Sequence, residues 1–126
     1  MAGCVLLVED NEVNRYLARF VLEKGGFRVV TAENGREAID QARLHRPDLI
    51  LMDIQMPVMD GYEATMQLKA DAQLRATPVV ALTAYAMPHE REQAMAAGCV
   101  GHIEKPIDTQ TFNAQVSAYL RATPQG

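Results

Sequence analysis

Cysteine is rare in this sequence, and long apolar runs are missing from it. Cys4 and Cys99 are its two cysteines, and their separation does not match the spacing of metal ligands. We therefore expect buried or half-buried thiols rather than a disulfide or a zinc site. No apolar stretch approaches the roughly 20 residues that span a bilayer, and no basic segment opens the N-terminus. These absences predict a cytoplasmic protein without a membrane segment or a secretory signal.

Runs of basic residues are missing as well. The formal net charge is −4, and the twelve Lys and Arg residues are scattered. Nucleic acids and anionic membranes usually require a basic patch, so we expect direct binding of neither. The 48% hydrophobic and 22% charged residues are typical of a globular protein. We expect one domain over residues 1–126, with a tail at 122–126.

Short apolar runs alternate with segments of helical periodicity along the chain. Continuous apolar runs of this length are typical of strands buried on both faces. The predicted strands are Cys4–Val8, Phe27–Ala32, Leu49–Met52, Val79–Thr83 and Val100–Glu104. The predicted helices are Val13–Lys24, Arg36–His45, Gly61–Ala70, Pro88–Ala97 and a last one capped by Asp108 or Thr109.

Apolar residues at helical spacing predict the buried face of each helix. In the first helix these residues are Val13, Leu17, Phe20 and Val21, and in the last helix they are Phe112, Val116, Tyr119 and Leu120. Alternating strands and helices with short connections predict a parallel sheet that helices cover on both faces. Five such units are too few for an eight-stranded barrel, which leaves an open, doubly wound α/β sheet. Ligands of such sheets bind at the carboxyl ends of the strands.

Charged and hydroxyl side chains stand at these strand ends. Glu9 and Asp10 follow the first strand, Asp53 the third, Thr83 ends the fourth, and Lys105 follows the fifth. Three carboxylates packed together repel one another unless a cation offsets their charge. All-oxygen ligands suit Mg²⁺, and a lysine can neutralise phosphoryl oxygens. The set predicts phosphoryl transfer, with an aspartyl phosphate at Asp53.

Four motifs in this order resemble a response-regulator receiver domain over nearly the whole chain. They are VEDN at Val8–Asn11, LILMDIQMPVMDG at Leu49–Gly61, VVALTA at Val79–Ala84 and EKPI at Glu104–Ile107. The resemblance implies a flavodoxin-like sheet with strand order 2-1-3-4-5 and five helices. It also implies a two-component switch that is phosphorylated on Asp53 in a Mg²⁺-dependent step. Such a module is an enzyme only toward its own phosphorylation and dephosphorylation.

The resemblance assigns a role to each matching residue. Asp53 would accept the phosphoryl group, and Mg²⁺ would bind Glu9, Asp10, Asp53 and the main-chain carbonyl of Gln55. Lys105 would contact the phosphoryl group. The side chain of Thr83 would turn toward it on activation.

The resemblance also implies residues that shape or tune the switch. Pro106 would follow a cis peptide bond, and Tyr85 would tune hydrolysis of the acyl phosphate. His102 stands where receivers usually carry Tyr or Phe. We expect it to be a packing residue, with an altered or pH-sensitive switch as the alternative.

A histidine kinase or a histidine phosphotransfer protein is the implied donor, docking near Asn14, Arg15 and Ala18. A downstream protein would read the surface around the fourth helix, fifth strand and fifth helix. Receiver segments of hybrid histidine kinases and phosphorylation-independent adaptors are the remaining alternatives. A flavodoxin-like electron carrier is disfavoured because Glu9 and Asp10 would repel a flavin phosphate. A haloacid-dehalogenase-type phosphatase is disfavoured because Gln55 replaces its second acid.

Overall fold

The computed structural model describes residues 3–54, 60–84 and 88–122 of the chain. Its strands form one parallel sheet in the order β2-β1-β3-β4-β5. The strands are β1 (Cys4–Val8), β2 (Arg28–Ala32), β3 (Leu49–Asp53), β4 (Val79–Thr83) and β5 (Gly101–Glu104). The helices are α1 (Glu12–Lys24), α2 (Gly35–His45), α3 (Gly61–Ala70), α4 (Pro88–Ala97) and α5 (Phe112–Ala122). This arrangement confirms the predicted fold class and strand order.

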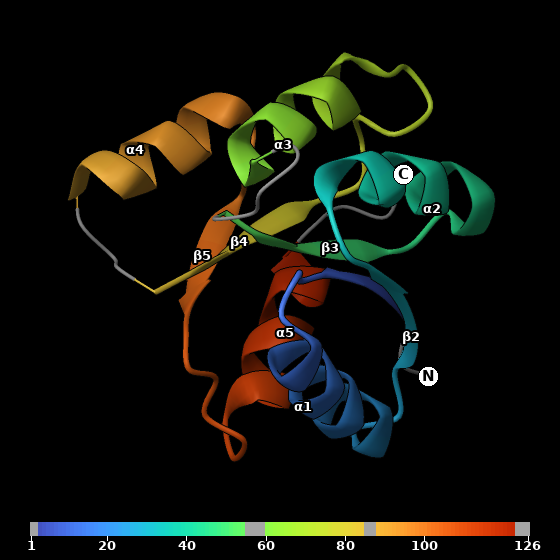
Figure 1. The fold of residues 1–126 in the computed structure, drawn as a ribbon, viewed down its shortest axis with the longest axis vertical. Coiled ribbons are helices and arrows are strands. Elements are labelled where there is room, and N and C mark those ends of the chain that lie inside the picture. The colour runs from blue at the N-terminus through green and yellow to red at the C-terminus, as the bar shows by residue number, and fades with distance from the viewer. Residues whose placement is uncertain (1–2, 55–59, 85–87, 123–126) are drawn as a thin grey trace.

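Helices cover the sheet on both faces, α1 and α5 on one and α2, α3 and α4 on the other (Figure 1). Successive strand residues point to opposite faces, which divides the core into two clusters. Leu6 and Ile50 pack in the cluster beneath α2, α3 and α4, whereas Leu7 and Leu51 pack in the cluster beneath α1 and α5. All five residues of β3 are buried, so the strand that ends in Asp53 lies at the centre of the molecule.

The buried face of α1 differs from the predicted one. Val13, Leu17 and Phe20 are 75%, 41% and 49% exposed, whereas Ala18 and Leu22 are buried. Of the predicted face, Val21 alone packs into the core. The helix has apolar residues on two sides, and small Ala18 lets the main chain approach the sheet. The prediction followed the bulkier side chains, which remain at the surface.

The predicted face of α5 is confirmed, because Phe112 and Val116 are fully buried and Tyr119 and Leu120 pack against the same cluster. The helix begins later than predicted. Asp108 caps a turn before it, where its Oδ1 accepts a hydrogen bond from the Gln110 N–H at 2.9 Å. Ala122 belongs to α5 rather than to a tail, and residues 123–126 lie outside the described part.

Three helices at the carboxyl edge of the sheet begin with a capping side chain. Asn11, Asn34 and Asp60 each accept a hydrogen bond from the main-chain N–H three residues later. Such caps satisfy N–H groups that a helix start leaves without a partner. The three caps hold the short strand-to-helix connections in place. The connection between β1 and α1 contains Glu9 and Asp10.

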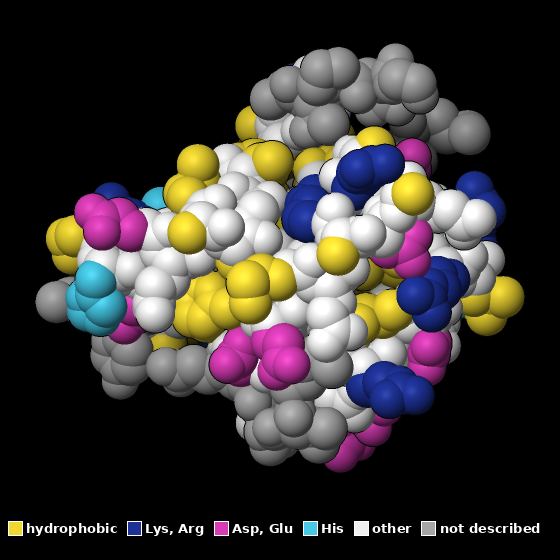
Figure 2. All heavy atoms as spheres, turned by 90° about the horizontal axis from the view of Figure 1, so that it is seen from above, with side chains coloured by type: hydrophobic (Ala, Val, Ile, Leu, Met, Phe, Trp, Pro, Cys, Tyr) yellow, Lys and Arg dark blue, Asp and Glu magenta, His cyan; other side chains and the backbone are white. Residues whose placement is uncertain are grey.

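Both cysteines are free thiols, with Cys99 buried and Cys4 half-buried, as predicted. Within the described residues, no helix has the length and apolar character needed to cross a membrane. On the face covered by α2, α3 and α4, Lys and Arg side chains lie mostly toward α2, interspersed with Asp and Glu (Figure 2).

Candidate functional site

Strand register brings the polar strand ends to one edge of the sheet. Val8 is paired with Met52, so Glu9 and Asp53 extend side by side beyond this pair. On the other side of β3, Asp53 is level with Leu82, and Thr83 is level with Glu104. Lys105 follows directly, and its N–H donates to the Thr83 carbonyl at 2.8 Å. Residues distant in sequence therefore meet at the carboxyl edge, as predicted.

Three carboxylates form the centre of this edge. Glu9, Asp10 and Asp53 each contribute an oxygen, and these oxygens lie within 4.8 Å of one another. Glu9 and Asp53 are only 2% and 1% exposed, while Asp10 lies at the surface. The Asn11 N–H donates to Oε1 of Glu9 at 3.2 Å. The cluster is therefore buried on the protein side and open to solvent at Asp10.

Lys105 lies against the two buried carboxylates. Its Nζ is 3.2 Å from Oδ2 of Asp53 and 3.3 Å from Oε2 of Glu9. Burial alone would lower the pKa of Lys105, but the charges of Asp53 and Glu9 outweigh it and raise the pKa above its usual value. The lysine is therefore a fixed cation. The peptide bond between Lys105 and Pro106 is cis, as the resemblance implied.

Asp53 has an unusual acidity in this arrangement. Burial, followed by the charge of Glu9, raises its pKa from 3.8 to about 7, although Lys105 acts in the opposite direction. One lysine thus does not fully offset the repulsion among the carboxylates. A divalent cation that binds oxygen would offset it, and the all-carboxylate donor set suits Mg²⁺. The residues present therefore fit a magnesium ion.

Thr83 connects the site to α4. Its Oγ1 donates to Oε2 of Glu90 at 3.4 Å, and the Tyr62 hydroxyl donates to the Glu90 carbonyl at 3.3 Å. Sequence reasoning missed Glu90 as a partner of Thr83. The available signal was an acidic residue in the first turn of α4, but acids are common at helix starts for reasons unrelated to a site.

His102 lies on β5, half-buried beneath α4. With Tyr62, Thr83 and Glu90 it lines a small cavity between α4 and the sheet. Its carbonyl accepts a hydrogen bond from the Tyr119 hydroxyl at 3.2 Å. Its predicted packing role agrees with this placement, while any effect on switching stays a prediction. The remaining predicted site residues, Gln55 and Tyr85, lie outside the described residues.

The chain belongs to the response regulator receiver domain family, because the model of that family matches residues 5–117. It is 47% identical over 120 residues to the polar-differentiation response regulator DivK of Brucella anthropi, covering 95% of this chain and 98% of that protein.

Solved structures agree with this assignment. Chemotaxis protein CheY4 of Vibrio cholerae has a TM-score of 0.87 at 31% identity and covers 98% of this chain and 100% of its own. The receiver domain of the sensor histidine kinase PA1611 of Pseudomonas aeruginosa has a TM-score of 0.84 at 36% identity, with 98% of each chain covered. That structure is described with a magnesium ion coordinated in the active-site cleft.

The family, the fold and the site together define a signalling module. The chain is a receiver domain of the type found in DivK and CheY response regulators, which places it in two-component signalling. Receiver domains bind Mg²⁺ at an acidic pocket, and the carboxylate cluster occupies the corresponding edge of this fold. Family membership removes the electron-carrier and phosphatase alternatives.

Proposed function

We propose that this chain accepts a phosphoryl group on Asp53 from a phosphohistidine donor and thereby changes a protein-binding surface. The observation that carries the proposal is the position of the Asp53 carboxylate. It ends the central strand, lies 3.2 Å from Lys105 Nζ, and shares a cluster with Glu9 and Asp10. A nucleophile, a fixed cation and a set of metal ligands therefore meet at one point.

The chemistry follows from these side chains. A carboxylate oxygen of Asp53 attacks phosphorus, a P–O bond forms as the P–N bond to the histidine breaks, and the departing imidazole takes up a proton. Lys105 neutralises charge on the phosphoryl oxygens. Glu9, Asp10, Asp53 and the Gln55 carbonyl would hold Mg²⁺, which supplies further charge neutralisation when bound. Attack by water on phosphorus later breaks the new P–O bond, which releases inorganic phosphate and restores the Asp53 carboxylate.

Thr83 supports the switching part of the proposal. Its hydroxyl donates to Glu90 in this structure, and phosphoryl oxygens on Asp53 would compete for this hydrogen bond. Transfer of this hydrogen bond would weaken the link between β4 and the first turn of α4. A shift in the population of α4 arrangements would follow, read by a partner at the surface of α4, β5 and α5.

The exposed apolar side of α1 supports a docking site for the donor. Val13, Leu17 and Phe20 lie at the surface, and Leu17 borders a groove between α1 and the segment after β5. Glu9 and Lys105 line the same groove, which therefore leads to the phosphoacceptor. A helical histidine protein with apolar contact residues fits this surface, because it could bury Leu17 while presenting its phosphohistidine to Asp53.

Similar receiver domains occur in two kinds of protein, response regulators and sensor histidine kinases. The match to DivK over 98% of its length favours a response regulator of that kind. The receiver domain of PA1611 shows that the same fold also occurs within a sensor histidine kinase. The reaction at Asp53 would be the same in both.

The proposal is tested by the intact mass of the chain after incubation with acetyl phosphate and Mg²⁺. We expect one phosphoryl adduct in the wild type, none in Asp53→Asn, and none when EDTA removes the metal. An unmodified wild-type mass under all conditions would favour a phosphorylation-independent adaptor instead. An adduct that persists in Asp53→Asn would place the chemistry at another residue.

A further inference from the structure

We propose that Arg15 is a positioning residue that holds the Mg²⁺-binding loop in place, an inference that rests on the proposed function. Its guanidinium Nη1 donates to the main-chain carbonyl of Glu9 at 2.9 Å and lies 3.5 Å from that of Asp10. The first distance is that of an ordinary N–H···O hydrogen bond, and the second is at the limit for one. Arg15 thus contacts the main chain of both acidic residues whose side chains lie beside Asp53 in the folded chain.

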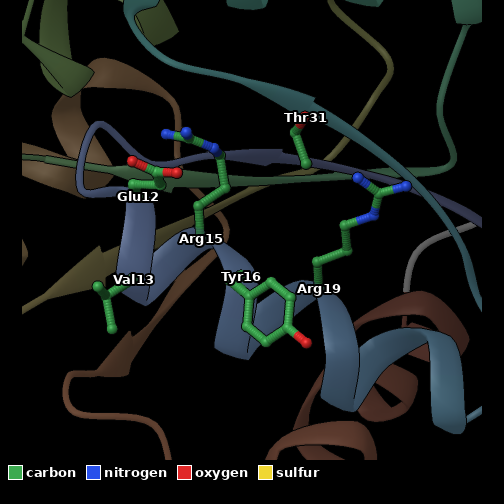
Figure 3. A pocket seen from close by; sticks show the side chains of 6 residues that line it. All are labelled: Glu12, Val13, Arg15, Tyr16, Arg19 and Thr31. Atoms are coloured by element: carbon green, nitrogen blue, oxygen red, sulfur yellow. The ribbon is translucent and has the colours of Figure 1, made fainter.

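The arginine is itself held from the other side. Its Nη2 donates to Oε1 of Glu33, directly after β2, at 3.2 Å, and its side chain is only 17% exposed. Figure 3 shows Arg15 rising from α1 past Glu12, with its guanidinium turned toward the start of the helix. The planar guanidinium therefore connects the β1–α1 loop, the first half of α1 and the end of β2.

The loop has a physical need for such a contact. Carboxylate oxygens of Glu9, Asp10 and Asp53 lie within 4.8 Å of one another, and Lys105 offsets only part of their repulsion, so without a divalent cation this repulsion disfavours the position of the loop. Main-chain hydrogen bonds from Arg15 resist displacement of the loop without using the carboxylate oxygens, which stay available to a metal. Residues that orient metal ligands in this way typically change metal affinity 10–100-fold when they are mutated.

The charge of Arg15 and its hydrogen bonds to the loop should affect Mg²⁺ affinity in opposite directions, so the two effects can be told apart. A guanidinium near a cation site repels the cation, so loss of its charge alone would tighten Mg²⁺ binding. Loss of the positioning contacts would weaken it. The two effects have opposite signs. Lysine keeps the charge but lacks the fork that reaches two groups at once, so Arg15→Lys separates geometry from charge.

The experiment measures Mg²⁺ binding to the full chain by isothermal titration calorimetry, without any phosphodonor. We expect about a tenfold or greater loss of affinity in Arg15→Gln and a smaller loss, about threefold or more, in Arg15→Lys. The control is Arg19→Gln, because Arg19 lies one turn further along the same helix and pairs only with Glu23, 3.4 Å away, among the described residues. The control should bind Mg²⁺ within twofold of the wild type.

A second readout locates the effect. The Mg²⁺-dependent shifts of the Asp10 and Asn11 amide signals in NMR should need more metal in both Arg15 variants. Unchanged or tighter binding in these variants, or an equal loss in Arg19→Gln, would overturn the proposal. If Arg15→Gln did not fold, Arg15→Lys alone would decide. A wild type that takes up no Mg²⁺ would refute the proposed function itself, and this is visible before any variant is measured.

Discussion

Lys105 Nζ lies 3.2 Å from Oδ2 of Asp53, although the two residues are on different strand ends, with β4 between them. The same nitrogen contacts Glu9, so one cation serves two buried carboxylates. The lysine therefore stabilises the acidic cluster before any reaction. It also stands where negative charge would develop on a phosphoryl group at Asp53.

Replacing Lys105 should slow phosphorylation strongly. We expect Lys105→Met to lower the rate with acetyl phosphate and Mg²⁺ by about 10²–10³, the usual effect of removing one group that stabilises a transition-state charge. Lys24→Met, in the last turn of α1, is the matched control and should react like the wild type. The rate of mass increase measures the difference. Equal rates for the two variants would show that Lys105 has no role in the reaction.

The raised pKa of Asp53 predicts a pH dependence of stability without metal. Its pKa is about 7 in the folded chain and near 3.8 when unfolded, so the folded form binds the proton more tightly. The resulting stability is complete below about pH 4 and is lost as pH rises to about 7. The magnitude is up to a few kcal/mol, since one pKa unit corresponds to about 1.4 kcal/mol.

Asp53→Asn isolates this contribution, because asparagine does not titrate. Urea unfolding in EDTA should show the variant gaining stability relative to the wild type between pH 4 and pH 7. A stability difference that stays constant over this range would mean that Asp53 ionises in the folded chain as it does in water.

Bound Mg²⁺ should offset the loss of folding stability caused by ionising the carboxylates of Glu9, Asp10 and Asp53. Because a ligand stabilises the state that binds it, saturating Mg²⁺ at pH 7 should raise Tm by several degrees; a concentration 100 times Kd contributes about 2.7 kcal/mol. Asp10→Asn should remove most of this increase while leaving Tm in EDTA little changed or higher, since it removes a repulsive charge. Differential scanning calorimetry distinguishes these results. An equal Mg²⁺ effect in Asp10→Asn would exclude that carboxylate as a ligand.

The hydrogen bond from Thr83 to Glu90 on α4 should oppose the movement of Thr83 toward a phosphoryl group on Asp53. Glu90→Ala removes the acceptor, so Thr83 no longer has to leave Glu90 when Asp53 is phosphorylated. One hydrogen bond contributes about 0.5–1.5 kcal/mol, which corresponds to an about 2- to 13-fold higher affinity for beryllofluoride with Mg²⁺. Glu92→Ala, an exposed acid on the same helix, is the control and should leave this affinity unchanged. A Glu90→Ala affinity at or below that of the wild type would contradict the restraint.

The two apolar sides of α1 should differ in their contribution to stability. Leu22 is fully buried, so Leu22→Ala should cost about 2–5 kcal/mol of unfolding free energy. Leu17 is 41% exposed, and Leu17→Ala should cost less than about 1 kcal/mol. Urea unfolding measures both. Equal losses of unfolding free energy would mean that Leu17 is as buried as Leu22. The originally predicted buried face of α1 would then be correct, and Leu17 would not be available to a docking partner.

The strand ends were predictable because polar residues terminate short apolar runs, and parallel strands carry their ends to one edge. Asp53, Glu9, Asp10 and Lys105 were therefore grouped correctly from local pattern and topology. The buried side of α1 was not predictable in this way, since Leu17 and Leu22 belong to two helical stripes of similar apolar character. The choice between them depends on how closely the helix approaches the sheet at Ala18.

Contacts between side chains on different elements were beyond sequence pattern. The Thr83–Glu90 hydrogen bond depends on where α4 packs against the sheet, and the Arg15 contacts depend on the path of the β1–α1 loop. An arginine in a helix or an acid at a helix start is common on any surface. Their partners are defined only once the fold is assembled.

The proposed function requires that Asp53 itself carries the phosphoryl group. Borohydride reduces an aspartyl phosphate to homoserine, so reduction of the phosphorylated chain, followed by digestion and tandem mass spectrometry, identifies the modified residue. We expect homoserine at position 53, dependent on Mg²⁺ and absent without phosphodonor. Homoserine at another aspartate, or a phosphorylated chain without any homoserine, would contradict the proposed function.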